Sequence, residues 1–79
     1  MRIDKYLKVS RLIKRRTLAN EACDSGRVKI NGKIAKAGSE VKVGDIVEIQ
    51  FGNSITKVEV TSVAEHVPKA EAREMYRIL

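Results

Sequence analysis

Residues 26–35 read GRVKINGKIA, and the pattern of this stretch decides the fold. Val28 and Ile30 alternate with cationic residues, which is typical of a strand with one buried face, and Asn31-Gly32 favours a tight turn between two strands. The alternation resumes over residues 33–35. The stretch therefore predicts a small β-hairpin directly after Gly26, where a helix can end because glycine tolerates positive φ.

Two short helices are predicted before the hairpin. Residues at spacings of three and four share one side of the first helix, namely Ile3, Tyr6, Leu7 and Ser10. The second helix is predicted over about residues 15–25, and its core-facing side is expected to hold Leu18, Ala19, Ala22 and Cys23. Leu12 and Ile13 lie in the connection and are expected to anchor it inward.

The sequence predicts further antiparallel strands after the hairpin. Val41 and Val43 precede a second turn at Gly44-Asp45, residues 46–51 are predicted as a strand, and Gly52-Asn53 closes another hairpin. The returning strand carries Ile55, Val58, Val60 and Val63. Since the step from residue 55 to residue 58 breaks the period of two, a bulge is predicted there.

The last segment is predicted to be helical. Pro68 interrupts the chain, and the composition of residues 69–79 favours a C-terminal helix. Its apolar face would hold Ala72, Met75, Tyr76 and Leu79. Together these elements predict an α+β fold, in which two N-terminal helices pack on a small, mainly antiparallel twisted sheet.

The length of 79 residues predicts one domain, with a core over about residues 1–64 and a C-terminal extension over about residues 65–79. The core must be aliphatic, because the chain contains one Phe, two Tyr and no Trp. For the same reason the chain lacks the aromatic platforms on which single-stranded bases usually stack. Contacts to phosphates and to duplex shape are therefore favoured.

Positive charge is concentrated in the first half of the chain. The formal net charge is +6, but residues 1–36 carry 11 basic and 3 acidic side chains, a net charge of +8, while residues 37–79 carry 5 and 7, a net charge of −2. A one-sided cationic surface attracts polyanions through counterion release, so nucleic acid is the first partner to consider.

Residues suited to catalysis or to metal binding are scarce. His66 and Cys23 are the only residues of their types, so no zinc-binding spacing exists, and the glycines are isolated turn residues rather than part of a phosphate-binding loop. We expect no enzymatic activity, no cofactor and no metal. A lone cysteine favours a reducing cytoplasm, and the charged N-terminal stretch predicts neither a signal peptide nor a membrane-spanning run.

The candidate RNA-binding residues gather where the two predicted helices meet. They are Arg2, Lys5, Lys8, Arg11, Lys14, Arg15 and Arg16. The N-terminus of the second helix would add unpaired N–H groups and the positive end of the helix dipole. The arginines rank above the lysines because a guanidinium can hold a phosphate through two hydrogen bonds and can stack on a base.

Other roles remain open for several of these charges. The cluster could be an ordinary solvated helix surface, and Lys29, Lys33 and Lys36 could either extend the basic face or be solvated edge residues. Asp4 is expected to cap the first helix or to orient Arg2 or Lys8 by pairing, rather than to face RNA.

Three segments resemble the S4 RNA-binding domain. They read RIDKYL at residues 2–7, SRLIKRRTLA at residues 10–19 and GRVKING at residues 26–32. The likeness runs to about residue 50, and the three segments at this spacing are much rarer in combination than any one of them. With KRRTLA in its second helix and a short extension, the chain is similar to the free-standing bacterial S4 proteins of ribosome-associated quality control, relatives of the small heat-shock S4 protein.

The resemblance implies a noncatalytic protein that is cytoplasmic and ribosome-associated. It would bind large ribosomal subunits obstructed by peptidyl-tRNA, contact 23S rRNA and the tRNA, and support C-terminal alanine tailing by a factor that recruits alanyl-tRNA. By motif, Arg2 and Arg16 are the strongest contact positions, supported by Arg11, Lys14 and Arg15. The family's usual serine before the second helix is replaced by Arg15, which adds charge and leaves the helix cap in question.

Two other functions stay open. A free S4 module could instead serve large-subunit recycling or ribosome assembly, since the same basic face would suit each task. We expect the free chain to be a monomer. The chain could also be a protein-interaction adaptor that binds its partner through the acidic residues of its second half, Glu40, Asp45, Glu48 and Glu59. A membrane partner is not expected.

Overall fold

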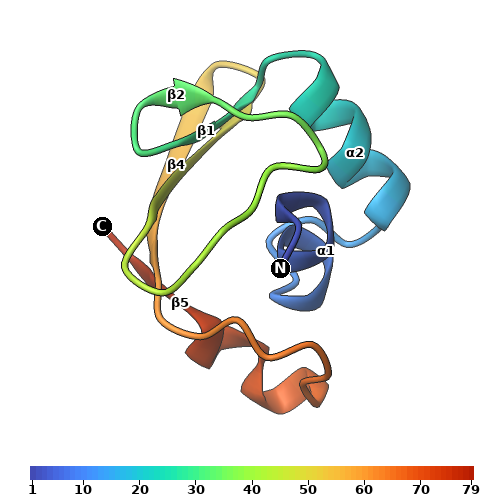
Figure 1. Cartoon of the computed structure of the whole chain (residues 1–79), viewed down its shortest axis with the longest axis vertical. Helices are drawn as coiled ribbons and strands as arrows, with labels where there is room; N and C mark the ends of the chain where they lie inside the picture. The colour runs from blue at the N-terminus through green and yellow to red at the C-terminus, as the bar shows by residue number, and fades with distance from the viewer.

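The computed structural model describes all residues 1–79 and has the predicted α+β class. The elements follow one another as α1 (Ile3–Val9), α2 (Arg16–Asp24), β1 (Val28–Ile30), β2 (Lys33–Ile34), β3 (Ile46–Phe51), β4 (Ser54–Val60), the 3₁₀ helix η1 (Lys69–Met75) and β5 (Tyr76–Ile78) (Figure 1). Both N-terminal helices and strands β1, β2 and β3 therefore lie where the sequence predicts them, whereas β4 ends at Val60 and does not include Val63. No helix has the length and apolar character needed to cross a bilayer.

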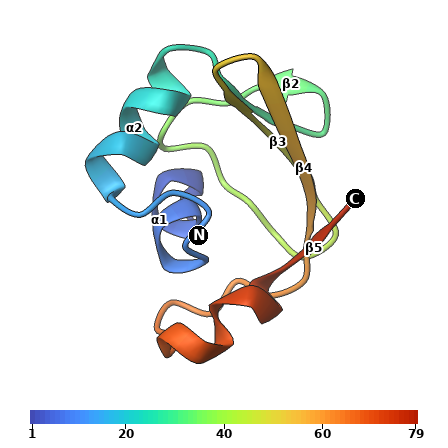
Figure 2. The ribbon, with the colours of Figure 1, turned by 180° about the vertical axis from the view of Figure 1, so that it is seen from behind.

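The five strands form one sheet in the order β2-β1-β3-β4-β5, and all neighbours are antiparallel. The turn between β1 and β2 has positive φ at both Asn31 (52°) and Gly32 (83°), which is the backbone that a two-residue hairpin turn requires. Figures 1 and 2 view the molecule from opposite sides, and both place α1 and α2 on the same side of the sheet. One face of the sheet is thus covered and the other faces solvent.

The core lies between the helices and the covered face of the sheet. Its fully buried apolar side chains come from α1, α2 and the three central strands, and they are Ile3, Tyr6, Leu7, Ala19, Val28, Val47, Ile49, Val58 and Val60. Ile13 is buried and Leu12 packs against this cluster, so the connection between the helices is anchored inward as predicted. Cys23 is buried, and this burial raises the pKa of its thiol to about 11.

Two expectations about apolar residues are wrong. Leu18 is 49% exposed, although Ala19, Ala22 and Cys23 of the same helix are buried. In a helix that turns by about 100° per residue, Leu18 lies roughly 90° from the centre of the stripe formed by those three residues, so it sits at its edge. No bulge follows Ile55: β3 and β4 pair without interruption, which turns Ile55 to the open face, where it is 66% exposed.

The C-terminal segment is helical only in part. Residues Lys69–Met75 form a 3₁₀ helix, but Tyr76–Ile78 form a strand that pairs with β4, so the predicted helix to Leu79 is wrong in its last turn. The Tyr6 hydroxyl donates a 2.7 Å hydrogen bond to the carbonyl of Met75, and Thr61 Oγ1 donates one of 2.6 Å to the carbonyl of Glu74. These long-range bonds and the ladder with β4 outweigh the helical preference of the local composition.

The loop between β2 and β3 fixes the start of α1. Ile3 N–H donates to the carbonyl of Ser39 over 2.8 Å, and Val41 N–H donates to the carbonyl of Met1 over 2.9 Å. The N-terminal amine also lies 2.7 Å from the Glu40 carboxylate. Residues 1–4 are therefore tied to this loop by hydrogen bonds, which gives Arg2 a defined position directly before α1.

Candidate nucleic-acid interface

The two helices are joined by a sharp turn that begins at Arg11. Arg11 has φ of 63°, and its N–H donates to the carbonyl of Lys8, while Ile13 N–H donates to the carbonyl of Leu7. A left-handed backbone costs a residue other than glycine roughly 1–2 kcal/mol. The chain tolerates this conformation, and the turn brings the end of α1 and the start of α2 close together.

Asp4 is the centre of a polar cluster at this helix pair. Its side chain is only 2% exposed, and its two carboxylate oxygens accept hydrogen bonds of 3.2 Å from Nε and Nη2 of Arg2. Oδ2 also accepts a 3.4 Å bond from the Asn20 amide and lies 3.5 Å from Nε of Arg16. Oδ1 accepts a 2.8 Å bond from the Lys5 N–H. One carboxylate thus holds two arginines that are 14 residues apart in the sequence.

The charge of Asp4 is stabilised by these partners. Burial by itself raises the pKa of the carboxyl, but the Lys5 N–H, the Asn20 amide and the charges of Arg16 and Arg2 outweigh it, so that the pKa lies below its ordinary value of 3.8. Of the roles open to Asp4, pairing with Arg2 is confirmed. No ion pair joins it to Lys8, and no side chain forms an N-cap hydrogen bond at α1.

We predict that Asp4→Asn lowers the free energy of unfolding at neutral pH by about 1–3 kcal/mol, since hydrogen bonds to a charged group are lost. Because the folded pKa is depressed, the stabilisation by Asp4 is complete well above pH 3.8 and is lost as the pH falls through the folded pKa. Urea unfolding of both proteins between pH 7 and pH 2.5 should give curves that converge only below pH 3.8. A constant difference at all pH values would contradict this assignment.

The N-terminus of α2 is open. Arg15 is its N-cap residue and has an extended backbone, and no side chain caps the first turn. With Arg15 in place of the family's usual serine, α2 therefore has no side-chain cap. A shallow hollow beside it is lined by Asp4, Arg16, Thr17, Asn20 and Glu21. Uncapped N–H groups at a helix start favour an anion, and the Arg16 guanidinium lies at the same place.

The remaining predicted cations lie in α1 and in the connection between α1 and α2. Lys5 is half-buried, with Nζ 3.6 Å from Oε1 of Glu65. Four others are exposed and form no ion pair, namely Lys8, Arg11, Lys14 and Arg15. The structure therefore brings Arg2 and Arg16 together on Asp4, gives Lys5 a carboxylate partner, and leaves a run of unpaired cations between the helices.

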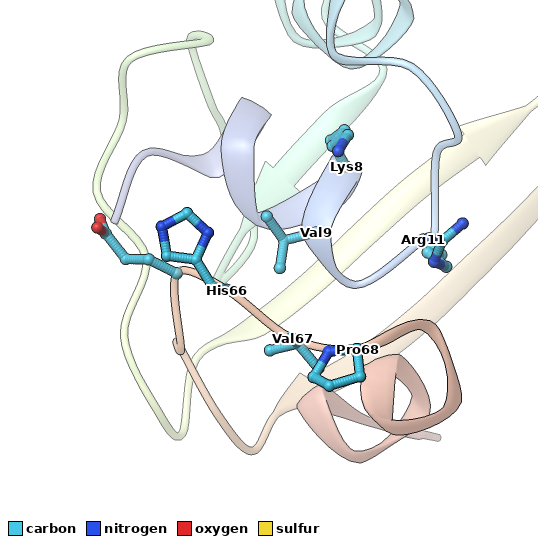
Figure 3. Close-up of a pocket in the computed structure, with 7 residues that line it drawn as sticks. Lys8, Val9, Arg11, His66, Val67 and Pro68 are labelled. Atoms are coloured by element: carbon cyan, nitrogen blue, oxygen red, sulfur yellow. The ribbon is translucent and has the colours of Figure 1, made fainter.

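The sequence did not indicate that residues 65–68 adjoin this surface. Lys8 and Arg11 line one hollow together with Val9, Glu65, His66, Val67 and Pro68 (Figure 3). More than fifty residues separate His66 from Arg11, and no local pattern links them. Their approach follows from the pairing of β5 with β4 and from the bond between Tyr6 and Met75.

The open face of the sheet carries balanced charge. Lys29 and Lys57 flank Glu48 in register across three strands, and Arg77 forms an ion pair with Glu59. Asp45 is buried and accepts hydrogen bonds from the Asn31 amide and the Lys42 N–H, while Glu40 pairs with the N-terminal amine. The open face of the sheet thus mixes charges of both signs, and the acidic residues of the second half form no continuous free patch.

Comparisons with known proteins show which proteins the chain resembles in sequence and in fold. The family described as S4 domain matches residues 1–47. The chain is 56% identical to the RQC P-site tRNA stabilizing factor of Halalkalibacterium halodurans over 99% of this chain and 89% of the relative, and 54% identical to the protein of that name in Bacillus subtilis over 100% and 92%. Among solved structures, the trimeric heat shock protein 15 of Vibrio cholerae superposes with a TM-score of 0.91 at 28% identity, covering 100% of this chain and 81% of that one.

Proposed function

The chain belongs to the S4 domain family, and from this we propose that it is a noncatalytic RNA-binding protein of ribosome-associated quality control. Its relatives and its S4 fold support RNA binding on the ribosome in the bacterial cytoplasm. The chain, as one S4-type domain and a monomer, binds large ribosomal subunits that still hold peptidyl-tRNA. There it contacts 23S rRNA and the tRNA and supports alanine tailing by a factor that recruits alanyl-tRNA.

The pairing of Arg2 and Arg16 on the buried Asp4 is the observation that carries this proposal. Two guanidiniums share one carboxylate, so a net positive charge remains beside the open N-terminus of α2. The closest approach of Arg16 to Asp4 is 3.5 Å, from Nε to Oδ2, and the Arg16 side chain is 48% exposed, so its guanidinium remains accessible to a phosphate. Held in this way, the two arginines can bind phosphates with less loss of side-chain freedom than free arginines.

The exposed cations extend the same surface along the connection between the helices. Lys8, Arg11, Lys14 and Arg15 follow one another over eight residues and carry no carboxylate partner. Such a surface suits the backbone of folded RNA, where phosphate contacts position the protein and the shape of the RNA selects the place. The charge-balanced open face of the sheet is then free to point away from the RNA.

Co-sedimentation with purified large subunits tests the proposal. Subunits that carry peptidyl-tRNA in the P-site should bind the chain more tightly than subunits without tRNA, and affinity should fall steeply as salt rises. In a reconstituted tailing reaction, addition of the chain should increase alanine incorporation. Equal, salt-insensitive binding to both kinds of subunit would contradict the proposal, because an apolar adaptor interface would behave in that way.

Arg11→Gly separates binding from stability. We predict an unchanged free energy of unfolding, or an increase of up to about 1 kcal/mol, because glycine adopts the left-handed backbone without strain. Subunit affinity should nevertheless fall about tenfold, the loss of one charged contact. Arg11→Lys is the matched control, since it keeps both the strain and the charge, and it should retain most of the affinity. A glycine variant that binds like the wild type would remove Arg11 from the interface.

A further inference from the structure

We propose that the hollow between the end of α1 and residues 65–68 binds one unpaired nucleotide of the RNA, an inference that rests on the proposed function. The hollow has a volume of about 480 Å³. Sites for small molecules are typically about 300–1,000 Å³, so a single nucleotide fits this range. Its lining combines the three kinds of group that a nucleotide requires, which are cations, apolar walls and a flat ring.

The two cations of the hollow are available to bind a phosphate. Lys8 and Arg11 lie on the rim and pair with no carboxylate, so both charges are available. Glu65 is the one acidic residue of the lining, and it lies 3.6 Å from the Lys5 ammonium, which offsets its charge. The hollow is therefore electrostatically suited to an anion.

The walls suit a base. Val9 and Val67 are half-buried and pack against the core, so their positions are fixed. Figure 3 shows the His66 ring and Arg11 on opposite sides of the view, with Lys8 above Val9 and with Val67 and Pro68 below it. A base can lie against the apolar surface and stack on the imidazole, an arrangement common for splayed-out nucleotides of RNA. In a chain with three aromatic residues, His66 supplies the flat ring that the helical surface otherwise lacks.

Both sides of the hollow are held in place. On one side, the backbone of Arg11 is fixed by its left-handed conformation and by the hydrogen bond from its N–H to the Lys8 carbonyl. The bonds from Tyr6 to Met75 and from Thr61 to Glu74 anchor the chain before and after residues 65–68, which form the opposite side. Residues 65–68 lie outside the S4 match of residues 1–47, whereas Lys8, Val9 and Arg11 lie within it, so the hollow is formed jointly by the matched domain and the segment that follows it.

NMR titration of the isotope-labelled chain tests the site directly. The probes are adenosine and uridine 5′-monophosphate, with ribose 5-phosphate as the probe that lacks a base. As the only histidine, His66 gives one set of imidazole signals. Mononucleotides should shift these signals and the amides of Lys8, Val9 and Val67, with dissociation constants on the order of millimolar. Ribose 5-phosphate should bind more weakly and shift the imidazole little. Equal effects of all three probes would overturn the base-binding assignment.

Variants connect the hollow to the ribosome. His66→Ala should weaken binding to tRNA-bearing large subunits about fivefold to tenfold, as expected for the loss of one stacking contact, and should leave the salt dependence unchanged. His66→Phe should restore the affinity, and Lys69→Ala, which removes an exposed charge outside the hollow, should have little effect. If His66→Ala binds subunits like the wild type, no RNA nucleotide occupies the hollow, even if free mononucleotides bind there. Wild-type chain that fails to bind subunits at all would instead overturn the proposed function.

Discussion

Arg16→Ala is expected to weaken binding to large subunits that carry P-site tRNA by about 10- to 100-fold, the effect of losing a charge-assisted contact worth about 1.5–3 kcal/mol. Arg16 lies at the uncapped start of α2 and is oriented by Asp4, so its loss removes both a charge and a fixed pair of donors. The slope of log affinity against log salt concentration should also become less steep by about one. Both quantities can be read from co-sedimentation at four salt concentrations.

Arg77→Ala is the matched control for this experiment. Arg77 is also an exposed arginine paired with a carboxylate, Glu59, but it lies in β5, away from the two helices. The Arg77→Ala variant should bind subunits with an affinity within about twofold of the wild type, because an exposed charge far from the interface contributes little. Either variant should keep its free energy of unfolding within about 1 kcal/mol. Equal losses of affinity in the two variants would mean that net charge alone matters, and would remove the specific role of Arg16.

Leu7→Ala is expected to lower the free energy of unfolding by about 2–5 kcal/mol, the range found for large-to-small substitutions in cores. Leu7 in α1 has no exposed surface and belongs to the hydrophobic core. A domain of this size has a total stability of only about 4–12 kcal/mol, so this single change could leave much of the protein unfolded. Urea denaturation followed by far-ultraviolet circular dichroism measures the difference.

Leu18→Ala provides the comparison within the same residue type. Since Leu18 is half exposed at the edge of α2, we expect a loss of less than about 1 kcal/mol. Equal destabilisation by Leu18→Ala and Leu7→Ala would contradict this prediction, because it would mean that the protein buries the Leu18 side chain. A large effect of Leu18→Ala on subunit binding, with stability retained, would instead place it in an interface.

The local elements were predictable because their signals are local. The face of α1 that holds Ile3 and Tyr6 repeats with the period of a helix, and Asn31-Gly32 supplies the two positive φ values that a tight hairpin needs. Errors arose where distant parts of the chain decide the outcome. Tyr76–Ile78 is a strand because β4 presents an edge for it, and composition alone cannot report that edge.

The candidate site was likewise predictable only in its local features. That cations gather at the start of the chain is visible in the sequence, and the motif already singled out Arg2 and Arg16. The sequence could not select the partner of Asp4, because Asn20 and Arg16 approach it only when the two helices pack together. Nor could it bring residues 65–68 beside Arg11, since that contact depends on the closing strand.

The hydrogen bond from Tyr6 to the carbonyl of Met75 has a consequence for biosynthesis. It joins residues that are 69 positions apart, so α1 gains this bond only when a segment made much later has folded against it. During translation residues 76–78 are made after both helices and strands β1 to β4, so the strand that completes the sheet follows all of its other elements. The nascent chain therefore carries its cationic helices before its core is closed, and it reaches the native state only after residues 76–78 have left the ribosome and docked on β4.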